Sequence, residues 1–458
     1  MDSMANRADS AGHEGIPHGG AFDVTHRLVL SIAIPMTLGF MTTPLLGLVD
    51  TAVVGRLGQA EALAGLAIGA VLFDLLFASF NFLRASTTGL TAQALGRGDT
   101  REQQAVFFRA LLSALACGLL LMALSPLLLA IGLKLMGPEP AVADTTTTYF
   151  TIRILSGPMA LANYAILGFV LGRGQGTLGL MLQAVINGIN IVLSILLGLV
   201  LGWGVAGVAW GTLIGEAAGA LAGLFIIVRG FERNHRPGWS QILDRSRLVE
   251  LFALNRDILI RTFVLLGAFT LMTRIGSGLG TTTLAANAVL MNFVLISAFY
   301  LDGLANAAEQ ITGRAIGADC RKAFDRGLKL TTLWSFGLAS IATLFFLVFG
   351  QAFIAILTNA ADVRAAAAAF LPWAAITGLT GALAYLMDGV FIGATWSDDM
   401  RNRMLMAFGG YLAALAVFVP SFGNHGLWAA LNIFLILRGI LLVVLVRRRA
   451  DQSFTFAQ

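Results

Sequence analysis

Long apolar stretches separated by short polar segments cover almost the whole chain after residue 28. Twelve such stretches follow one another, at 29–53, 62–93, 105–134, 145–171, 177–202, 205–229, 254–276, 283–312, 327–357, 365–394, 403–422 and 425–446. A helix needs roughly 20 apolar residues to cross the hydrocarbon core of a bilayer. The pattern therefore predicts an all-α integral membrane protein with twelve transmembrane helices and short loops.

The composition agrees with this prediction. Of the 458 residues, 57% are hydrophobic and only 12% are charged, about half the charged fraction of a soluble domain. We therefore exclude a cytosolic enzyme, a disordered protein and a nucleic-acid-binding protein. The two cysteines and five scattered histidines give no metal-ligand spacing or disulfide framework, and we expect no metal and no cofactor.

The basic residues predict the orientation in the membrane. If the N-terminus is inside the cell, most of the 30 Lys and Arg residues fall in inner segments, and only Arg56, Lys134, Arg274 and Arg364 fall in outer ones. Basic residues collect in cytoplasmic loops of membrane proteins. We therefore expect a multi-pass protein of a bacterial-type inner membrane with both termini in the cytoplasm.

The two halves of the chain repeat each other at an offset of 221 residues. Gly55 matches Gly276, and Tyr164 matches Tyr385. Each half has six predicted spans, so the halves form parallel, pseudo-symmetric lobes, and in such transporters the substrate path lies between the lobes. The predicted organisation is an N-terminal tail (1–27), an N-lobe (28–229), an inter-lobe loop (230–249), a C-lobe (250–449) and a C-terminal tail (450–458).

Acidic residues within the predicted spans are candidates for function. A charge at the bilayer centre costs about 2.5–3.5 kcal/mol on insertion scales. Asp50 follows Pro35 and Pro44 on the first span, and a proline can kink a helix. A protonatable acid on a bendable helix is a plausible coupling switch, although Asp50 could instead hold the turn at 55–58 by hydrogen bonds.

Polar residues on the fourth and fifth spans could line an N-lobe cavity together with Asp50. Asn187 and Asn190 share one helix face at their spacing. The alternative is that these side chains only join helices by hydrogen bonds, each contributing perhaps 0.6 kcal/mol. The predicted N-lobe set is Pro35, Thr43, Asn163, Tyr164, Asn187, Asn190 and Ser194.

A polar stripe on the eighth span contains Asp302, Asn306 and Glu309, which share one helix face. Arg84 is a base on a span of the opposite half. We hypothesise that Arg84 and Glu309 approach each other when the cytoplasmic side is closed and form part of an inner gate; the alternative is that each pairs within its own lobe. The predicted C-lobe cavity set is Asp302, Asn306, Glu309, Tyr385 and Asp388.

Several segments together resemble the MATE (multidrug and toxic compound extrusion) transporters, and most closely their DinF (DNA-damage-inducible protein F) branch. The segments are 35–58 with PLLGLVDTAVVG, 82–93 with FLRASTTGLTAQ, 254–257 with LNRD, 287–291 with NAVLM, and 386–395 with LMDGVFIGAT. The likeness covers the chain after residue 26. The resemblance implies a two-lobe, twelve-helix fold that alternates access, and efflux of amphipathic, often cationic compounds in exchange for H⁺ or Na⁺.

The resemblance also implies residue roles. Asp50 matches an acid that is protonated in related proteins, Pro35 matches a proline at which the first helix bends, and Asn163 and Asn190 match polar partners. Ser194 stands where the branch often has an Asp, and the seventh span lacks the mid-span Glu of the NorM type, which disfavours a NorM-like Na⁺ site. We therefore expect H⁺ as the coupling ion, with Na⁺ possible.

We thus expect a non-enzymatic, proton-coupled efflux antiporter that acts as a monomer in the lipid bilayer, binds small amphipathic molecules and binds no nucleic acid. An alternative is a flippase for lipids or lipid-linked oligosaccharides with related architecture. That function requires a basic groove for phosphate, and only Arg84, Arg153 and Arg438 are assigned to the membrane rather than to its inner or outer side.

Overall fold

The structure, a computed structural model, describes residues 22–232 and 235–454, and in these ranges every regular element is a helix. Twelve helical segments are long and apolar enough to cross a membrane, which confirms the predicted fold class. The first lobe contains α1 (His26–Gly55), α2 (Ala60–Ser79), α3 (Phe82–Gly96), α4 (Thr100–Ala123), α5 (Ser125–Met136), α6 (Pro140–Arg153), η1 (Ile154–Ser156), α7 (Gly157–Gly172), α8 (Gly176–Leu193), η2 (Ser194–Val200) and α9 (Gly204–Arg229).

A short helix leads into the second lobe. The elements are α10 (Trp239–Ile242), α11 (Arg245–Gly278), α12 (Thr281–Gly317), α13 (Arg321–Leu357), α14 (Ala361–Gly393), α15 (Ser397–Phe422) and α16 (Asn424–Ser453). The second lobe is more regular than the first, because each of its spans is one unbroken helix. In the first lobe the second span breaks between α2 and α3, and the fourth span breaks at η1.

Helix ends differ from the apolar stretches where capping residues and prolines set them. The predicted span 105–134 is two helices, since α4 ends at Ala123 and α5 begins with Pro126 in its first turn, a position that suits the missing N–H of proline. Helix α11 begins at Arg245, nine residues before its apolar stretch at 254. Asp244 caps it by accepting hydrogen bonds from the Ser246 and Arg247 backbone N–H groups at 2.9 and 3.1 Å.

The predicted terminal tails and inter-lobe loop are only partly described. Helix α1 already begins at His26, inside the range predicted as a tail, and α16 continues to Ser453. Residues 1–21 and 455–458 lie outside the described ranges. Helix α10 and the start of α11 occupy 239–242 and 245–249 of the segment predicted as an inter-lobe loop.

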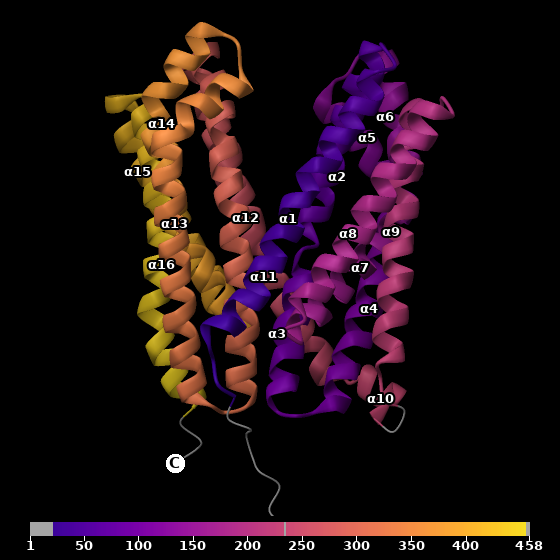
Figure 1. The fold of residues 1–458 in the computed structure, drawn as a ribbon, viewed down its shortest axis with the longest axis vertical. Coiled ribbons are helices and arrows are strands. Elements are labelled where there is room, and N and C mark those ends of the chain that lie inside the picture. Colours follow the sequence, from indigo (N-terminus) through magenta and orange to yellow (C-terminus); the bar gives the residue numbers. More distant parts are fainter. Residues whose placement is uncertain (1–21, 233–234, 455–458) are drawn as a thin grey trace, which may run out of the picture.

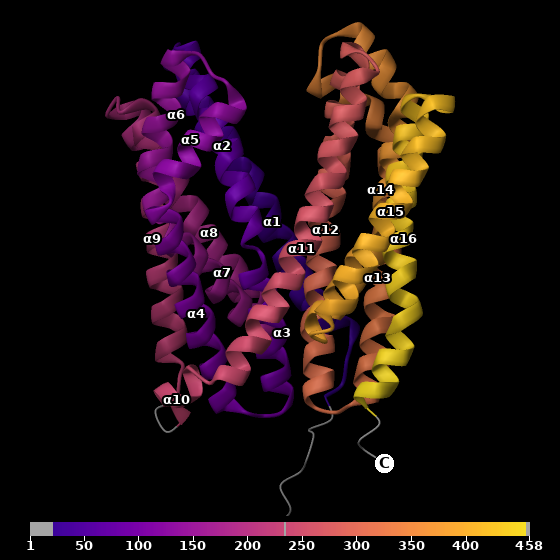
Figure 2. The ribbon, with the colours of Figure 1, turned by 180° about the vertical axis from the view of Figure 1, so that it is seen from behind.

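The two lobes lie together at the end of the molecule where α10 and the last residues of α16 are found, and they diverge toward the opposite end (Figures 1 and 2). We call these ends the terminal side and the far side. Contact on the terminal side is close because glycines face the other lobe. A Cβ added at Gly313 of α12 would lie 2.7 Å from the Ala92 Cβ of α3. Small residues allow such close approach of helices, and Gln93 adds a hydrogen bond to the Gly393 carbonyl at 3.0 Å.

Candidate functional site

Asp50 lies near the far end of α1 with its side chain turned into the first lobe, where the residue is 8% exposed. Ser194, at the start of η2, lies beside the carboxyl group, and Arg153 interacts with it electrostatically. Among the described residues, one of the two carboxyl oxygens has no hydrogen-bond partner. Burial without full pairing disfavours the charged form of a carboxyl group, and the role of Asp50 in proton coupling stays a prediction.

Arg153 is the cation of the first lobe's buried polar group. It donates a hydrogen bond to the Tyr149 hydroxyl oxygen at 2.6 Å and lies 3.7 Å from the Glu216 carboxylate. Its guanidinium also lies over the Phe73 ring, 5.0 Å from the centroid. Both Asp50 and Glu216 interact electrostatically with this one cation. Arg153 can therefore compensate only one of the two carboxylates at a time.

The polar residues predicted on the fourth and fifth spans are joined by hydrogen bonds inside the lobe. Ser194 donates to the Asn190 side-chain oxygen at 3.0 Å, and Asn190 donates to Thr212 of α9 at 3.0 Å. Ser194 and Asn190 are both buried, and Ser194 also lies beside Asp50. Asp50, Ser194 and Asn190 therefore lie together, joined by hydrogen bonds between helices, and their lining of a cavity stays a prediction.

The remaining predicted residues of the N-lobe set lie in different surroundings. Asn163 donates to the Glu216 backbone carbonyl at 2.9 Å, and Tyr164, next to it on α7, is half-buried. Asn187 donates to Thr42 of α1 at 2.6 Å. Thr43, next to Thr42, is exposed, and its place in a cavity lining stays a prediction.

Arg84 and Glu309 form an ion pair across the lobe interface, with 3.9 Å between Arg84 Nη1 and Glu309 Oε2. The same Nη1 donates to the Asn306 side-chain oxygen at 2.6 Å. Asn81, at the break between α2 and α3, accepts a 3.1 Å hydrogen bond from Arg84 Nε and so fixes the side chain. The geometry brings together the residues of the hypothesised inner gate, whose role in gating stays a prediction.

Asp388 is engaged in ion pairs. Its Oδ2 accepts from Arg438 Nη2 at 2.7 Å and also from Arg261 of α11. Asp302 lies in the same group and interacts electrostatically with both arginines. Tyr385 lies beside Arg438, whose guanidinium is 5.8 Å from the centroid of the Tyr385 ring. The two acids and two arginines balance in charge.

Sequence reasoning missed the partners that define these groups. Arg261 lies within the predicted span 254–276, but it was counted with the basic residues of the inner segments and was therefore not considered as a partner of Asp388. Glu216 and Arg153 were visible as charges in apolar stretches, but no local spacing pairs residues on two distant spans. Within residues 22–232 and 235–454, His, Cys, Asp and Glu side chains form no group of three that could hold a metal ion.

The family model MatE matches residues 35–196 and 258–417, one segment in each lobe. The chain belongs to the MatE family. It is 37% identical over 438 residues to "DNA damage-inducible protein F" of Escherichia coli (strain K12), covering 93% of each chain. It is also 25% identical to "Probable multidrug resistance protein NorM" of Chromobacterium violaceum, over 92% of this chain and 93% of that one.

Solved structures of this family share the fold. A structure described as "Outward-facing conformation of a multidrug resistance MATE family transporter of the MOP superfamily" superposes with a TM-score of 0.84 at 17% identity, over 94% of this chain and 97% of that one. "Crystal structure of MATE in the bent conformation" also gives 0.84 at 17% identity, over 94% and 96%. This MatE family member is therefore a multi-pass membrane transporter of small molecules and not an enzyme, and the resemblance to MATE proteins and their DinF branch is confirmed.

Proposed function

We propose that this transporter exports amphipathic, often cationic organic compounds in exchange for H⁺, with Asp50 as the proton-binding group. The proposal places the termini in the cytoplasm, so that the terminal side faces inward and the far side outward. The distribution of basic residues supports this orientation. The arrangement of the lobes, in contact on the terminal side and apart on the far side, then corresponds to an outward-open conformation.

The charge balance of the two lobes is the observation that carries the proposal. In the first lobe Asp50, Asp74 and Glu216 all interact electrostatically with a single arginine, Arg153. In the second lobe Asp302 and Asp388 are matched by two arginines. Apart from the Arg84–Glu309 pair that joins the lobes, the acids around Arg153 therefore carry excess negative charge when they are ionised, whereas the Asp302–Asp388 group does not.

Excess negative charge allows a proton and a cationic substrate to compete. Protonation of Asp50 removes one negative charge beside Arg153, and an organic cation near Asp50 offsets the same charge when the proton is absent. Opposite charges attract strongly in a region of low dielectric constant. Binding of a proton from outside would thus weaken binding of the cation and release it outward.

The proton gradient supplies enough energy for useful transport. One proton driven by about 100 mV and one pH unit supplies roughly 3.7 kcal/mol. That energy supports an approximately 500-fold gradient of a neutral substrate at one proton per molecule. For a monovalent cation exchanged one for one, the voltage cancels and about a tenfold gradient remains.

Purified protein in liposomes tests the proposal. We would impose either a pH gradient or a Na⁺ gradient and follow ethidium accumulation, with protein-free liposomes as the control. Accumulation driven by the pH gradient alone supports the proposal. Accumulation that requires Na⁺ contradicts the ion assignment. Movement of a fluorescent phospholipid between leaflets without ethidium transport would favour the flippase alternative.

A further inference from the structure

A groove of about 940 Å³ lies on the first lobe between α4 and α9. Helix α9 forms one wall through Leu221 and Phe225, which are 64% and 62% exposed. Helix α4 contributes Phe108 and Leu111 to the lining. Because both helices cross the membrane and these apolar side chains point outward, the groove opens to the lipid.

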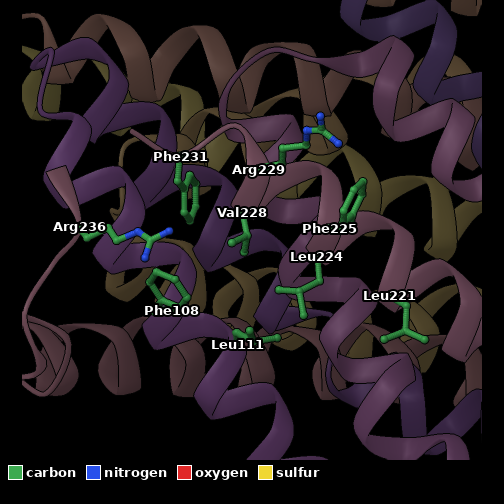
Figure 3. A pocket seen from close by; sticks show the side chains of 9 residues that line it. All are labelled: Phe108, Leu111, Leu221, Leu224, Phe225, Val228, Arg229, Phe231 and Arg236. Atoms are coloured by element: carbon green, nitrogen blue, oxygen red, sulfur yellow. The ribbon is translucent and has the colours of Figure 1, made fainter. Parts of the chain in front are cut away.

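Two arginines lie at one end of this apolar lining. Arg229 is the last residue of α9, and Arg236 follows in the segment that leads to the second lobe. Figure 3 shows Arg236 at the left beside Phe108 and Arg229 at the top near Phe225, with Leu111 and Leu221 along the bottom. On α9 itself, Leu221 lies two turns before Arg229. The groove thus has an apolar end toward the membrane interior and a basic end at the terminal side.

The two arginines are free to bind an anion. Within the described ranges, no carboxylate lies within 4.0 Å of either guanidinium, and the neighbouring acid Glu232 pairs with His235 at 2.8 Å. Arg229 is held over the Phe225 ring, 5.6 Å from the centroid. Both arginines are exposed, so their charges can reach a ligand at the membrane surface.

The segment that carries Arg236 is anchored next to the groove. Phe231 is buried and packs edge-on against Phe107, Phe108 and Phe169, at centroid distances of 5.6, 5.8 and 5.7 Å. Gln104 of α4 also donates to the Glu232 carbonyl at 3.5 Å. The two arginines are therefore attached to a packed part of the lobe, which lowers the entropy lost on binding.

We propose that this groove binds one anionic phospholipid, with acyl chains against α4 and α9 and the phosphate between Arg229 and Arg236. The occupant follows from charge complementarity: apolar side chains at membrane depth match acyl chains, and two unpaired cations at the surface match an anionic headgroup. Basic pockets between transmembrane helices are a recognised way to bind such headgroups. The site lies on the outer surface of one lobe and is separate from Asp50 and from the lobe interface.

The test is a titration of the purified full-length protein in detergent with dioleoylphosphatidylglycerol, counting bound lipids by native mass spectrometry. Dioleoylphosphatidylcholine carries the same chains without net charge and serves as the lipid control. At about 1 kcal/mol per basic residue, loss of both arginines corresponds to an approximately 30-fold weaker affinity. We expect the Arg229→Ala/Arg236→Ala variant to show this loss of affinity for phosphatidylglycerol and no change in its affinity for phosphatidylcholine.

Two further variants separate the groove from general charge effects. Arg97→Ala/Arg101→Ala removes two exposed positive charges of the same lobe, one at the end of α3 and one in the first turn of α4. This variant should bind phosphatidylglycerol as wild type does. Leu224→Trp keeps both arginines, fills part of the groove and should lose the lipid.

Four results would overturn the proposal. They are equal binding of both lipids, wild-type affinity in the Arg229→Ala/Arg236→Ala variant, complete competition by inorganic phosphate, and a change from dimer to monomer in the Leu224→Trp variant. The third result would indicate a free-anion site, and the last would indicate that a second copy of the chain covers the groove.

Discussion

Substitution of Arg84 by glutamine should shift the equilibrium between the conformations of the two lobes. Arg84 joins the lobes through its 2.6 Å hydrogen bond to Asn306 and its ion pair with Glu309. A hydrogen bond involving a charged group contributes about 1.5–3 kcal/mol, and Glu309 is only 2% exposed. Loss of about 2 kcal/mol from the present conformation changes the population ratio about 30-fold.

The assay measures distances between spin labels on the far side by double electron–electron resonance. Labels at Gln59 and Thr281, which are exposed, lie beside the far ends of α1 and α12. The native Cys117 and Cys320 would first be replaced by serine. We expect Arg84→Gln to move the distribution from long toward short distances, because closure of the far side accompanies separation of the terminal side.

A matched control uses a buried ion pair inside one lobe. Arg109 is 3% exposed and pairs with Glu102 at 2.9 Å, so Arg109→Gln should leave the distances unchanged. The Arg84→Gln/Glu309→Gln double variant should show less than the sum of the two single effects, as expected for residues in contact. An unchanged distribution in Arg84→Gln, or an equal shift in Arg109→Gln, would refute the reasoning.

Three further predictions follow from the packing and the charges. Gly313→Leu adds a side chain at a position where even an added Cβ would lie 2.7 Å from the Ala92 Cβ of the other lobe. Because this side chain separates the lobes on the terminal side, the same far-side distances should become shorter. Unchanged long distances would contradict the packing argument. Asp388→Asn removes the carboxylate that pairs with Arg261 and Arg438 and should destabilise the fold by about 3–5 kcal/mol. The unfolding temperature should fall, and adding Arg261→Gln to this variant should partly restore it. Glu216→Gln removes one negative charge from the first lobe and should raise the KM for ethidium several-fold without changing that for a neutral dye; equal changes for both would contradict the charge argument.

The spans and the two-lobe fold were predictable from the sequence because they depend on local hydropathy and on the repeat. Hydropathy marks the part of a helix that crosses lipid, whereas a helix end depends on caps. The start of α11 at Arg245, set by Asp244, therefore lay outside the prediction.

The pairing of buried charges was less predictable because the two halves do not repeat their charged residues. At the offset of 221 residues, Asp50 corresponds to Leu271 and Glu216 corresponds to Leu437. The lobes share backbone architecture but differ in charge, so one lobe gives no guide to the ion pairs of the other. The Arg84–Glu309 pair could be proposed because both residues were rare charges on facing halves. Thr42 contacts Asn187 whereas Thr43 is exposed, since neighbouring residues on a helix point about 100° apart.

Proton movement driven by substrate tests the central claim most directly. Wild type and Asp50→Asn would be reconstituted in liposomes with a pH-sensitive dye inside, and ethidium would be added with and without Na⁺. We predict proton movement in wild type without Na⁺ and its loss in Asp50→Asn, while Asp302→Asn retains it. Proton movement that persists in Asp50→Asn, or that requires Na⁺ in wild type, would contradict the assignment of H⁺ coupling to the first lobe.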